Sequence, residues 1–172
     1  MSLVPTLETE RLRLRGHTLA DYPVMVEVWG DEVTVRHTIG RPSTPEETWG
    51  RLHRYAGHWA LMGFGYWAWE EKGTGRFVGE GGFSDFKRDV QPALDAPEHG
   101  WALAPWAHGQ GFALEALTAQ LAWADAHFKR RDFVCMIAPE NERSLRLAQK
   151  VGYREYARAL YHGAAEVLLR RV

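Results

Sequence analysis

Two glycines stand in the segment His108-Gly109-Gln110-Gly111-Phe112-Ala113, where a short apolar strand is expected to turn into a long helix. Such a turn leaves backbone N–H groups unpaired at the helix N-terminus, where the helix dipole also favours negative charge. Glycine has no Cβ atom, so a phosphate can approach the backbone closely. The segment therefore predicts an anion site that suits a pyrophosphate, although a tight turn with small residues for helix packing explains a lone Gly-x-Gly equally well.

Two better-known phosphate-binding loops do not fit this segment. The dinucleotide-binding loop needs a third glycine where Leu114 stands, and the P-loop needs a Gly-Lys-Ser/Thr sequence that the chain lacks. The segment therefore matches neither the dinucleotide-binding loop nor the P-loop.

The glycine segment lies inside an expected strand, turn, helix, strand unit, formed by a strand at 101–104, a helix at 112–127 and a strand at 133–138. A variable loop at 85–97 precedes this unit. The remaining predicted elements are strands at 11–15, 66–70 and 76–83, helices at 20–29, 43–62 and 141–151, and a final strand from 153 to near 172. Strands followed by alternating helices and strands favour a mixed sheet with helices packed on it.

Length and composition limit the possible classes of protein. The chain has 172 residues, of which 45% are hydrophobic and 25% charged, so we expect one soluble domain over residues 1–172. The net charge of −1 disfavours nucleic acid as the main partner. No leader-like segment or membrane-spanning apolar stretch is present, and the single cysteine suits a reducing compartment, so we expect a cytoplasmic protein with no membrane partner.

A second motif supports a specific resemblance. The spacing Asn141-x-x-Ser144-x-x-Leu147-x-x-Lys150-x-Gly152-Tyr153 follows the strand at 133–138, and together with the glycine segment it resembles the GNAT acetyltransferase superfamily. The opening "LETERLRLR" is similar to the branch that includes ribosomal-protein N-terminal acetyltransferases. The resemblance runs from about Leu7 to the C-terminus. It implies an α/β (α+β) fold with a mixed, mostly antiparallel twisted sheet flanked by helices, the acyl-CoA N-acyltransferase fold.

The resemblance also implies how acetyl-CoA would be bound. The N–H groups of Gln110, Gly111, Phe112 and Ala113 would hold the pyrophosphate, and the strand that contains Trp101, Ala102 and Leu103 would pair with the pantetheine amides. Asn141 and Ser144 would lie near the pantetheine arm. The simpler reading, compatible with this one, is that Asn141 caps a helix with Ser144 on its first turn. The family's first loop position holds Gln or Arg where this chain has His108, which keeps Gly109 and the backbone cradle but removes one usual side-chain donor.

The reaction that the resemblance implies is acetylation of a primary amine, at a protein N-terminus or on a small molecule, by direct attack in a ternary complex. For a general base we consider Glu98 first and Glu80 second; each could also be a solvated carboxylate at a strand end. His99 alternates away from Glu98 along the strand. Many family members protonate the leaving thiolate with a tyrosine immediately after the Leu147 position, where this chain has Ala148.

Several other groups have weaker expectations. Cys135, the only cysteine, falls in an apolar strand and is expected in the core rather than as a nucleophile. The histidines have no metal-ligand spacing, so we predict no metal. Trp29 and Arg36-His37-Thr38 fall in the helical region that frames the acceptor cleft in the family.

Two other functions stay open at this stage. Ala148 in place of tyrosine also suits a catalytically silent acyl-CoA-binding module that acts as a sensor or subunit. An enzyme that acts on a hydroxyl acceptor is the third reading, and it would form an ester instead of an amide. The resemblance leaves a homodimer open, since dimers are common in the family.

Overall fold

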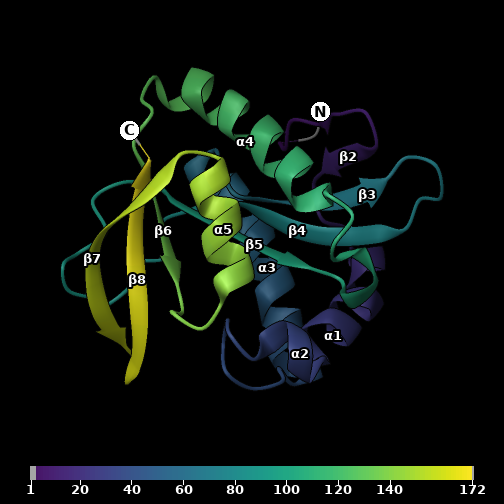
Figure 1. The fold of residues 1–172 in the computed structure, drawn as a ribbon. Helices are drawn as coiled ribbons and strands as arrows, with labels where there is room; N and C mark the ends of the chain where they lie inside the picture. The colour runs from purple at the N-terminus through teal and green to yellow at the C-terminus, as the bar shows by residue number, and fades with distance from the viewer. Residues whose placement is uncertain (1–2, 172) are drawn as a thin grey trace.

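The structure, a computed structural model, describes residues 3–171. Within this range the chain forms a sheet of eight strands in the order β1-β2-β3-β4-β5-β6-β8-β7 (Figure 1). Every neighbouring pair is antiparallel except β5 and β6, which are parallel. The strands are β1 (Leu7–Glu8), β2 (Leu12–Arg15), β3 (Tyr66–Glu71), β4 (Phe77–Ser84), β5 (Glu98–Leu103), β6 (Phe133–Ile137), β7 (Tyr153–Tyr161) and β8 (Ala164–Arg171). This is the mixed, mostly antiparallel sheet that the sequence predicted.

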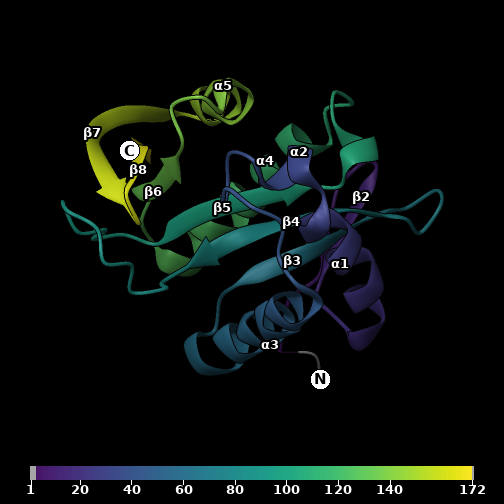
Figure 2. The same ribbon diagram turned by 90° about the horizontal axis from the view of Figure 1, so that it is seen from below.

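Helices cover both faces of the sheet (Figure 2). One apolar cluster joins α4 and α5 to the sheet through residues such as Leu117 and Ala148, and a second joins α1, α2 and α3 to the other face through residues such as Met25 and Leu52. The helices are α1 (Tyr22–Gly30), α2 (Glu32–Val35), α3 (Pro45–Met62), α4 (Phe112–Phe128) and α5 (Glu142–Lys150), with short 3-10 helices at Leu19–Asp21 and Pro105–Ala107. The sheet therefore separates two layers of helices.

Local sequence explains why these helices begin where they do. Thr44 caps α3 by accepting a hydrogen bond from the N–H of Glu47, whose carboxylate in turn accepts from the N–H of Thr44. Asn141 caps α5 by accepting from the N–H of Ser144 at 3.2 Å. Gly152, with φ of 102°, follows α5 and lets the chain turn into β7.

The prediction of one final strand from 153 to near 172 is wrong, because the chain forms the hairpin β7–β8 there. His162 and Gly163 connect the two strands with φ angles of 48° and 79°, as a two-residue hairpin turn requires. The sequence His-Gly is a weaker signal for this turn than Asn-Gly, so the run from Tyr153 was not divided there. The short elements β1 and α2 were also not predicted.

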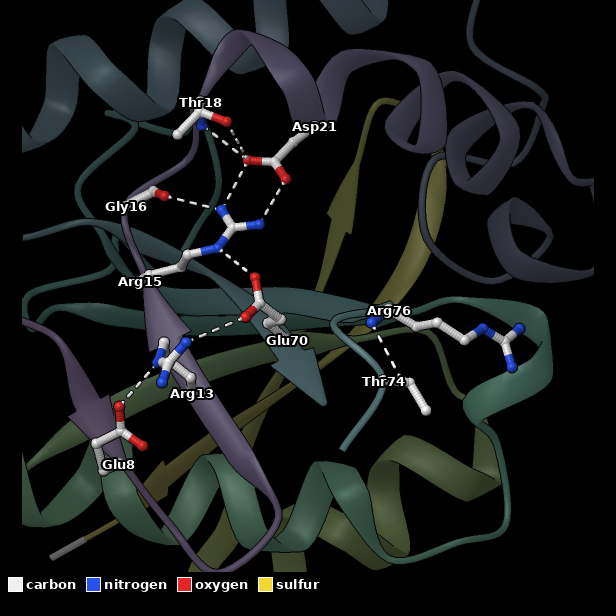
Figure 3. A network of polar contacts seen from close by, with 9 residues as sticks. All are labelled: Glu8, Arg13, Arg15, Gly16, Thr18, Asp21, Glu70, Thr74 and Arg76. Atoms are coloured by element: carbon white, nitrogen blue, oxygen red, sulfur yellow. Dashed lines mark hydrogen bonds and ion pairs between the residues drawn. The ribbon is translucent and has the colours of Figure 1, made fainter. Parts of the chain in front are cut away.

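A buried ion-pair network ties the first helical segment to the sheet (Figure 3). The guanidinium of Arg15, on β2, donates from both terminal nitrogens to Asp21 at 2.8 and 2.9 Å, and its Nε donates to Glu70 on β3 at 2.9 Å. Burial acts to raise the pKa of Asp21, but the Arg15 guanidinium and the Thr18 N–H hold it below its ordinary value. This paired arrangement fixes where α1 begins, and so where Trp29 lies against the sheet.

Candidate active site

The two parallel strands β5 and β6 diverge immediately after they meet. Their register contains one pair, Glu98 opposite Val134, whereas β5 pairs with β4 along its whole length. Figure 1 shows β6 running downward while β5 runs toward the right of the view, with α5 in front of the gap. The edge of β5 beyond Glu98, which includes Trp101, Ala102 and Leu103, therefore carries backbone N–H and C=O groups that β6 does not pair.

The glycine segment lies where β5 leads into α4. Gly109 and Gly111 have φ angles of 75° and 81°, which favour glycine, and Gly111 caps the N-terminus of α4. The loop is braced from outside: Gln110 Nε2 donates to the Trp106 carbonyl at 2.8 Å, and Arg11 Nη1 donates to the Gln110 carbonyl at 2.9 Å. The first N–H groups of α4, at Phe112 and Ala113, have no partner within the helix.

Two arginines near this loop were missed by the sequence analysis. Arg11 is close enough to Gly111 that a Cβ atom there would lie 3.4 Å from its Nη2, and its Nε pairs with Glu115 Oε2 at 2.8 Å. The charge of Arg143 acts on His108. Burial is the main cause that lowers the pKa of His108, and Arg143 lowers it further, so the neutral imidazole is favoured. The cations beside the loop are therefore arginines rather than His108.

The second motif lies on α5, against the same gap. Asn141 is the helix cap, as the sequence suggested, and Ser144 is half-buried on the first turn. Ala148 is fully buried and belongs to the apolar cluster beneath α4 and α5. No proton donor therefore stands at the Ala148 position.

Glu98 lies at the point where β5 and β6 begin to separate, and only 6% of the residue is exposed. Its carboxylate accepts from Arg88 Nε at 2.6 Å, and Arg88 Nη1 donates to the hydroxyl of Tyr161 at 3.3 Å. Arg88 comes from the loop between β4 and β5, and Tyr161 from the end of β7. Neither the contact of Arg88 with Glu98 nor that of Arg88 with Tyr161 was expected from the sequence, because no motif links loop 85–97 to these strands.

Glu80, the second carboxylate considered, is fully buried on β4. Trp29 Nε1 and the Tyr55 hydroxyl donate to its Oε1 at 2.8 Å each, and His17 Nε2 lies 3.1 Å from its Oε2. Burial acts to raise the pKa of Glu80, but the His17 contact, with Tyr55 and the charge of Arg51, holds it below the ordinary value. This geometry favours a carboxylate that joins α1 and α3 to the sheet over one that meets an acceptor from solvent. The hydrogen bond to Glu80 holds Trp29 against the sheet. Arg36 and Thr38, the other residues considered for the acceptor cleft, are exposed in the segment after α2.

The other face of β5 carries a separate buried network. His99 contacts the Tyr153 hydroxyl at 3.0 Å and Gln120 Oε1 at 2.9 Å, so it points away from Glu98 as the strand alternation predicted. Burial lowers the pKa of His99 to about 4. Cys135 is fully buried nearby, and burial raises the pKa of its thiol well above the ordinary value, so the expectation of a core cysteine is confirmed.

Glu166, on β8, is a further carboxylate that the sequence analysis did not consider. It is 9% exposed, and no residue within 3–171 donates a hydrogen bond to its carboxylate. Burial, with the charges of Glu98 and Glu140 and against that of Arg88, raises its pKa to about 7. The missed hairpin explains the omission, because β8 was not separated from β7.

The part of the chain that the structure describes offers neither a metal site nor a membrane-spanning helix. Among residues 3–171, no three His, Cys, Asp or Glu side chains are grouped so that they could hold a metal ion. No helix in the same part of the chain is long and apolar enough to cross a membrane.

Comparisons with known proteins agree with this architecture. The sequence profile of the acetyltransferase (GNAT) domain matches residues 11–154. A solved protein from Bordetella pertussis, assigned to the GnaT acetyltransferase family, is 33% identical with a TM-score of 0.85, over 98% of this chain and 99% of that one. RimL, a ribosomal L7/L12 alpha-N-protein acetyltransferase solved with coenzyme A, shares the fold at 15% identity and a TM-score of 0.77, over 98% of each chain.

The curated relative YkkB of Bacillus subtilis, itself uncharacterized, is 34% identical over 93 residues. That match spans 52% of this chain and 51% of YkkB, so this chain covers about half the length of that relative. The profile match and the full-length likeness to the Bordetella protein are independent of it. The chain belongs to the GNAT family of acetyltransferases.

Proposed function

We propose that this chain transfers an acetyl group from acetyl-CoA to a primary amine by direct attack in a ternary complex, with residues 1–172 acting as one catalytic domain. The observation that carries the proposal is the unpaired edge of β5 beyond the Glu98–Val134 pair, next to the glycine loop at the N-terminus of α4. An extended molecule with amides at one end and phosphates at the other fits this combination.

The chain's own residues suit acetyl-CoA in their chemistry. Backbone N–H groups from Gln110 to Ala113 would hold the pyrophosphate, with Arg11 beside the loop supplying positive charge. The free edge at Trp101–Leu103 would pair with the pantetheine amides, and Asn141 and Ser144 would border the arm from α5. Coenzyme A in the solved complex of RimL supports this assignment as a property of the shared fold.

The acceptor must present a neutral amine, and the thioester of acetyl-CoA supplies the activated acyl group. Glu98 is our proposed base, because it lies where the strands separate and is held by Arg88. A backbone N–H on the free edge of β5 would stabilise the developing oxyanion. With Ala148 buried, no side chain is assigned to protonate the leaving thiolate.

The proposed acceptor is a primary amine, on a protein N-terminus or on a small molecule. Both a protein N-terminus and a small-molecule amine can present a neutral primary amine. RimL, which shares the fold, is a ribosomal L7/L12 alpha-N-protein acetyltransferase. The net charge of −1 argues against nucleic acid, and the lone buried thiol suits the cytoplasm. The alternative function is a catalytically silent acyl-CoA-binding module. Ala148 supports it, because alanine cannot protonate the leaving thiolate.

A thiol-release assay tests the proposal. Purified protein is mixed with acetyl-CoA and a panel of α-amino peptides, polyamines and aminoglycosides, and free coenzyme A is measured with a thiol reagent. We expect release that depends on at least one amine and yields an acetylamide by mass spectrometry. Tight binding of acetyl-CoA without release for any amine would favour the silent module, and an ester product would favour a hydroxyl acceptor.

A further inference from the structure

A groove of about 530 Å³ lies between α3, the segment that precedes it and the tip of the β7–β8 hairpin. Both the hairpin tip and the connection between α2 and α3 lie at the lower end of the molecule in Figure 1. Arg41, Arg51 and Arg54 line the groove with His162, and Glu47 is its one carboxylate. Three arginines against one glutamate give this groove a charge of +2, in a chain whose net charge is −1.

Two of these arginines have no carboxylate partner. Arg51 and Arg54 stand three positions apart on α3, so they share one face of the helix. Within residues 3–171, neither guanidinium group forms an ion pair or a hydrogen bond. Most other arginines around the molecule are paired, for example Arg15 with Asp21 and Arg171 with Asp125. The groove therefore concentrates positive charge that no ion pair neutralises, although the charge of Arg51 also acts on the buried Glu80.

The same two guanidinium groups are held in place by aromatic rings. Arg51 lies over the ring of Trp29 at 3.6 Å, and Arg54 over the ring of Phe86 at 4.5 Å. The Nε of Arg51 is buried and has no hydrogen-bond partner, which is costly unless a ligand supplies an acceptor. A guanidinium held over a ring keeps N–H groups free, and such groups bind carboxylate or phosphate.

We propose that this basic groove is the subsite that binds an anionic group, carboxylate or phosphate, on the acceptor amine. The inference rests on the proposed acetyl transfer, and it narrows the acceptor class from any primary amine to amines that carry negative charge near the amino group. The groove borders the buried Glu80, because Arg51 is close enough to influence that carboxylate, and its hairpin wall includes His162, next to the Tyr161 that contacts Arg88. The acceptor's anionic group would thus be held on the side of the sheet where Glu98 and Arg88 lie.

Substitution of Glu47 should change anion binding in the opposite direction to substitution of an arginine in the groove. It pairs with Arg41 through contacts of 2.6 and 3.0 Å, and so cancels one of the three positive charges. Glu47→Gln keeps a side chain that can still complete the cap of α3, yet it frees Arg41. If the groove binds anions, this substitution strengthens binding, whereas loss of Arg54 weakens it. A role of these residues in stability alone predicts no such opposite signs.

The test measures binding without turnover. The peptide Ser-Asp-Glu-Asp, labelled with fluorescein through an amide at its C-terminus, is titrated with protein by anisotropy at low salt. The neutral peptide Ser-Asn-Gln-Asn, labelled in the same way, is measured beside it. O-phosphoethanolamine serves as an unlabelled competitor, which separates a peptide source of the anion from a small phosphorylated amine. We expect the acidic peptide to bind about tenfold more tightly than the neutral one, with affinity that falls as salt rises.

The variants decide the assignment. Arg54→Gln, at an exposed position, should weaken acidic-peptide binding about tenfold, Arg51→Gln at least as much, and Glu47→Gln should strengthen it several-fold. Arg130→Gln, which removes an arginine that follows α4 and pairs with Asp132, is the control outside the groove and should change nothing. Equal binding of the two peptides, or an equal loss in Arg130→Gln and Arg54→Gln, would overturn the inference.

The outcomes also separate this inference from the proposed acetyl transfer. Arginine-dependent binding of the acidic peptide with no thiol release from any amine would overturn the transfer and leave the anion subsite standing. Thiol release that proceeds equally with acidic and neutral amines, unchanged by Arg54→Gln, would leave the transfer standing and remove the subsite.

Discussion

Arg88 Nε lies 2.6 Å from Glu98 Oε2, and solvent reaches only 22% of the Arg88 side chain and 7% of the Glu98 side chain. The arginine reaches Glu98 from the long loop between β4 and β5, so a segment without regular structure positions the first candidate base. Because the pair is nearly closed to solvent, replacing one partner leaves the other with an unpaired buried charge. Substitutions at Glu98 must therefore be read for both protonation and ion pairing.

Glu98→Gln should lower the rate at pH near 7 much more than at pH 9. A positioned general base contributes about 10²- to 10⁴-fold, and it becomes redundant once the amine loses its proton to solvent. With an α-amino acceptor, whose pKa is near ~8, the loss should be small, and with a lysine-like amine, whose pKa is near ~10.4, it should be large. The test measures the rate of thiol release for the wild type and Glu98→Gln from pH 7 to pH 9.

Arg88→Gln is the control for Glu98→Gln. It breaks the same ion pair but leaves the carboxylate in place, so a loss that is equal in both variants and uniform across pH would mean that Glu98 supports the strand or positions substrate. No loss in Glu98→Gln with any acceptor would return the assignment to Glu80 or to water.

Gly111→Val should abolish acetyl-CoA binding while the protein stays folded. The glycine has φ of 81°, where a branched side chain is strained, and its Cβ would point to within 3.4 Å of Arg11 Nη2, into the space between the loop and that arginine. Gly75→Val is the matched control, since Gly75 also has a positive φ of 72° in the β3–β4 turn but is remote from the loop. Titration calorimetry measures both; unchanged affinity in a folded Gly111→Val protein would remove the anion-site argument.

The sequence predicted the parts of this molecule that depend on short-range patterns. The cap at Thr44, the strand, turn, helix, strand unit around Gly109 and Gly111, and the cap at Asn141 are all set by residues a few positions apart. Contacts between segments far apart in the chain could not be predicted in this way. Arg88 with Glu98, Tyr55 with Glu80, and Arg11 beside Gly111 each depend on how strands pair across the sheet.

Cys135→Ala should keep most of the acetyl-transfer activity and lower the free energy of unfolding by roughly 1 kcal/mol through lost packing. The thiol is fully buried and its pKa is raised, so it is a poor nucleophile, and direct transfer needs no acyl-enzyme. Intact-protein mass spectrometry after mixing with acetyl-CoA is the check. An acetyl adduct on the wild-type protein that is absent from Cys135→Ala would establish a covalent route instead.

Glu166→Gln should stabilise the protein at pH 8 but not at pH 5. The folded chain raises the pKa of Glu166 to about 7, from an ordinary value of 4.5, mainly through burial. Between these two values the folded state keeps a proton that the unfolded state has lost, so the wild-type protein loses stability as pH rises through this window. Glutamine does not titrate, so its advantage should grow with pH. We expect it to reach on the order of 1 kcal/mol at pH 8, because some solvent still reaches Glu166 and screens its charge.

Urea unfolding of both proteins at pH 5 and pH 8 measures this difference. Glu10→Gln is the matched control, because Glu10 is exposed and should give the same free energy of unfolding as the wild type, within about 0.5 kcal/mol, at both pH values. The prediction would be wrong if the advantage of Glu166→Gln over wild type in free energy of unfolding became smaller from pH 5 to pH 8. It would mean that the charge of Arg88 holds Glu166 ionised, rather than burial keeping it protonated.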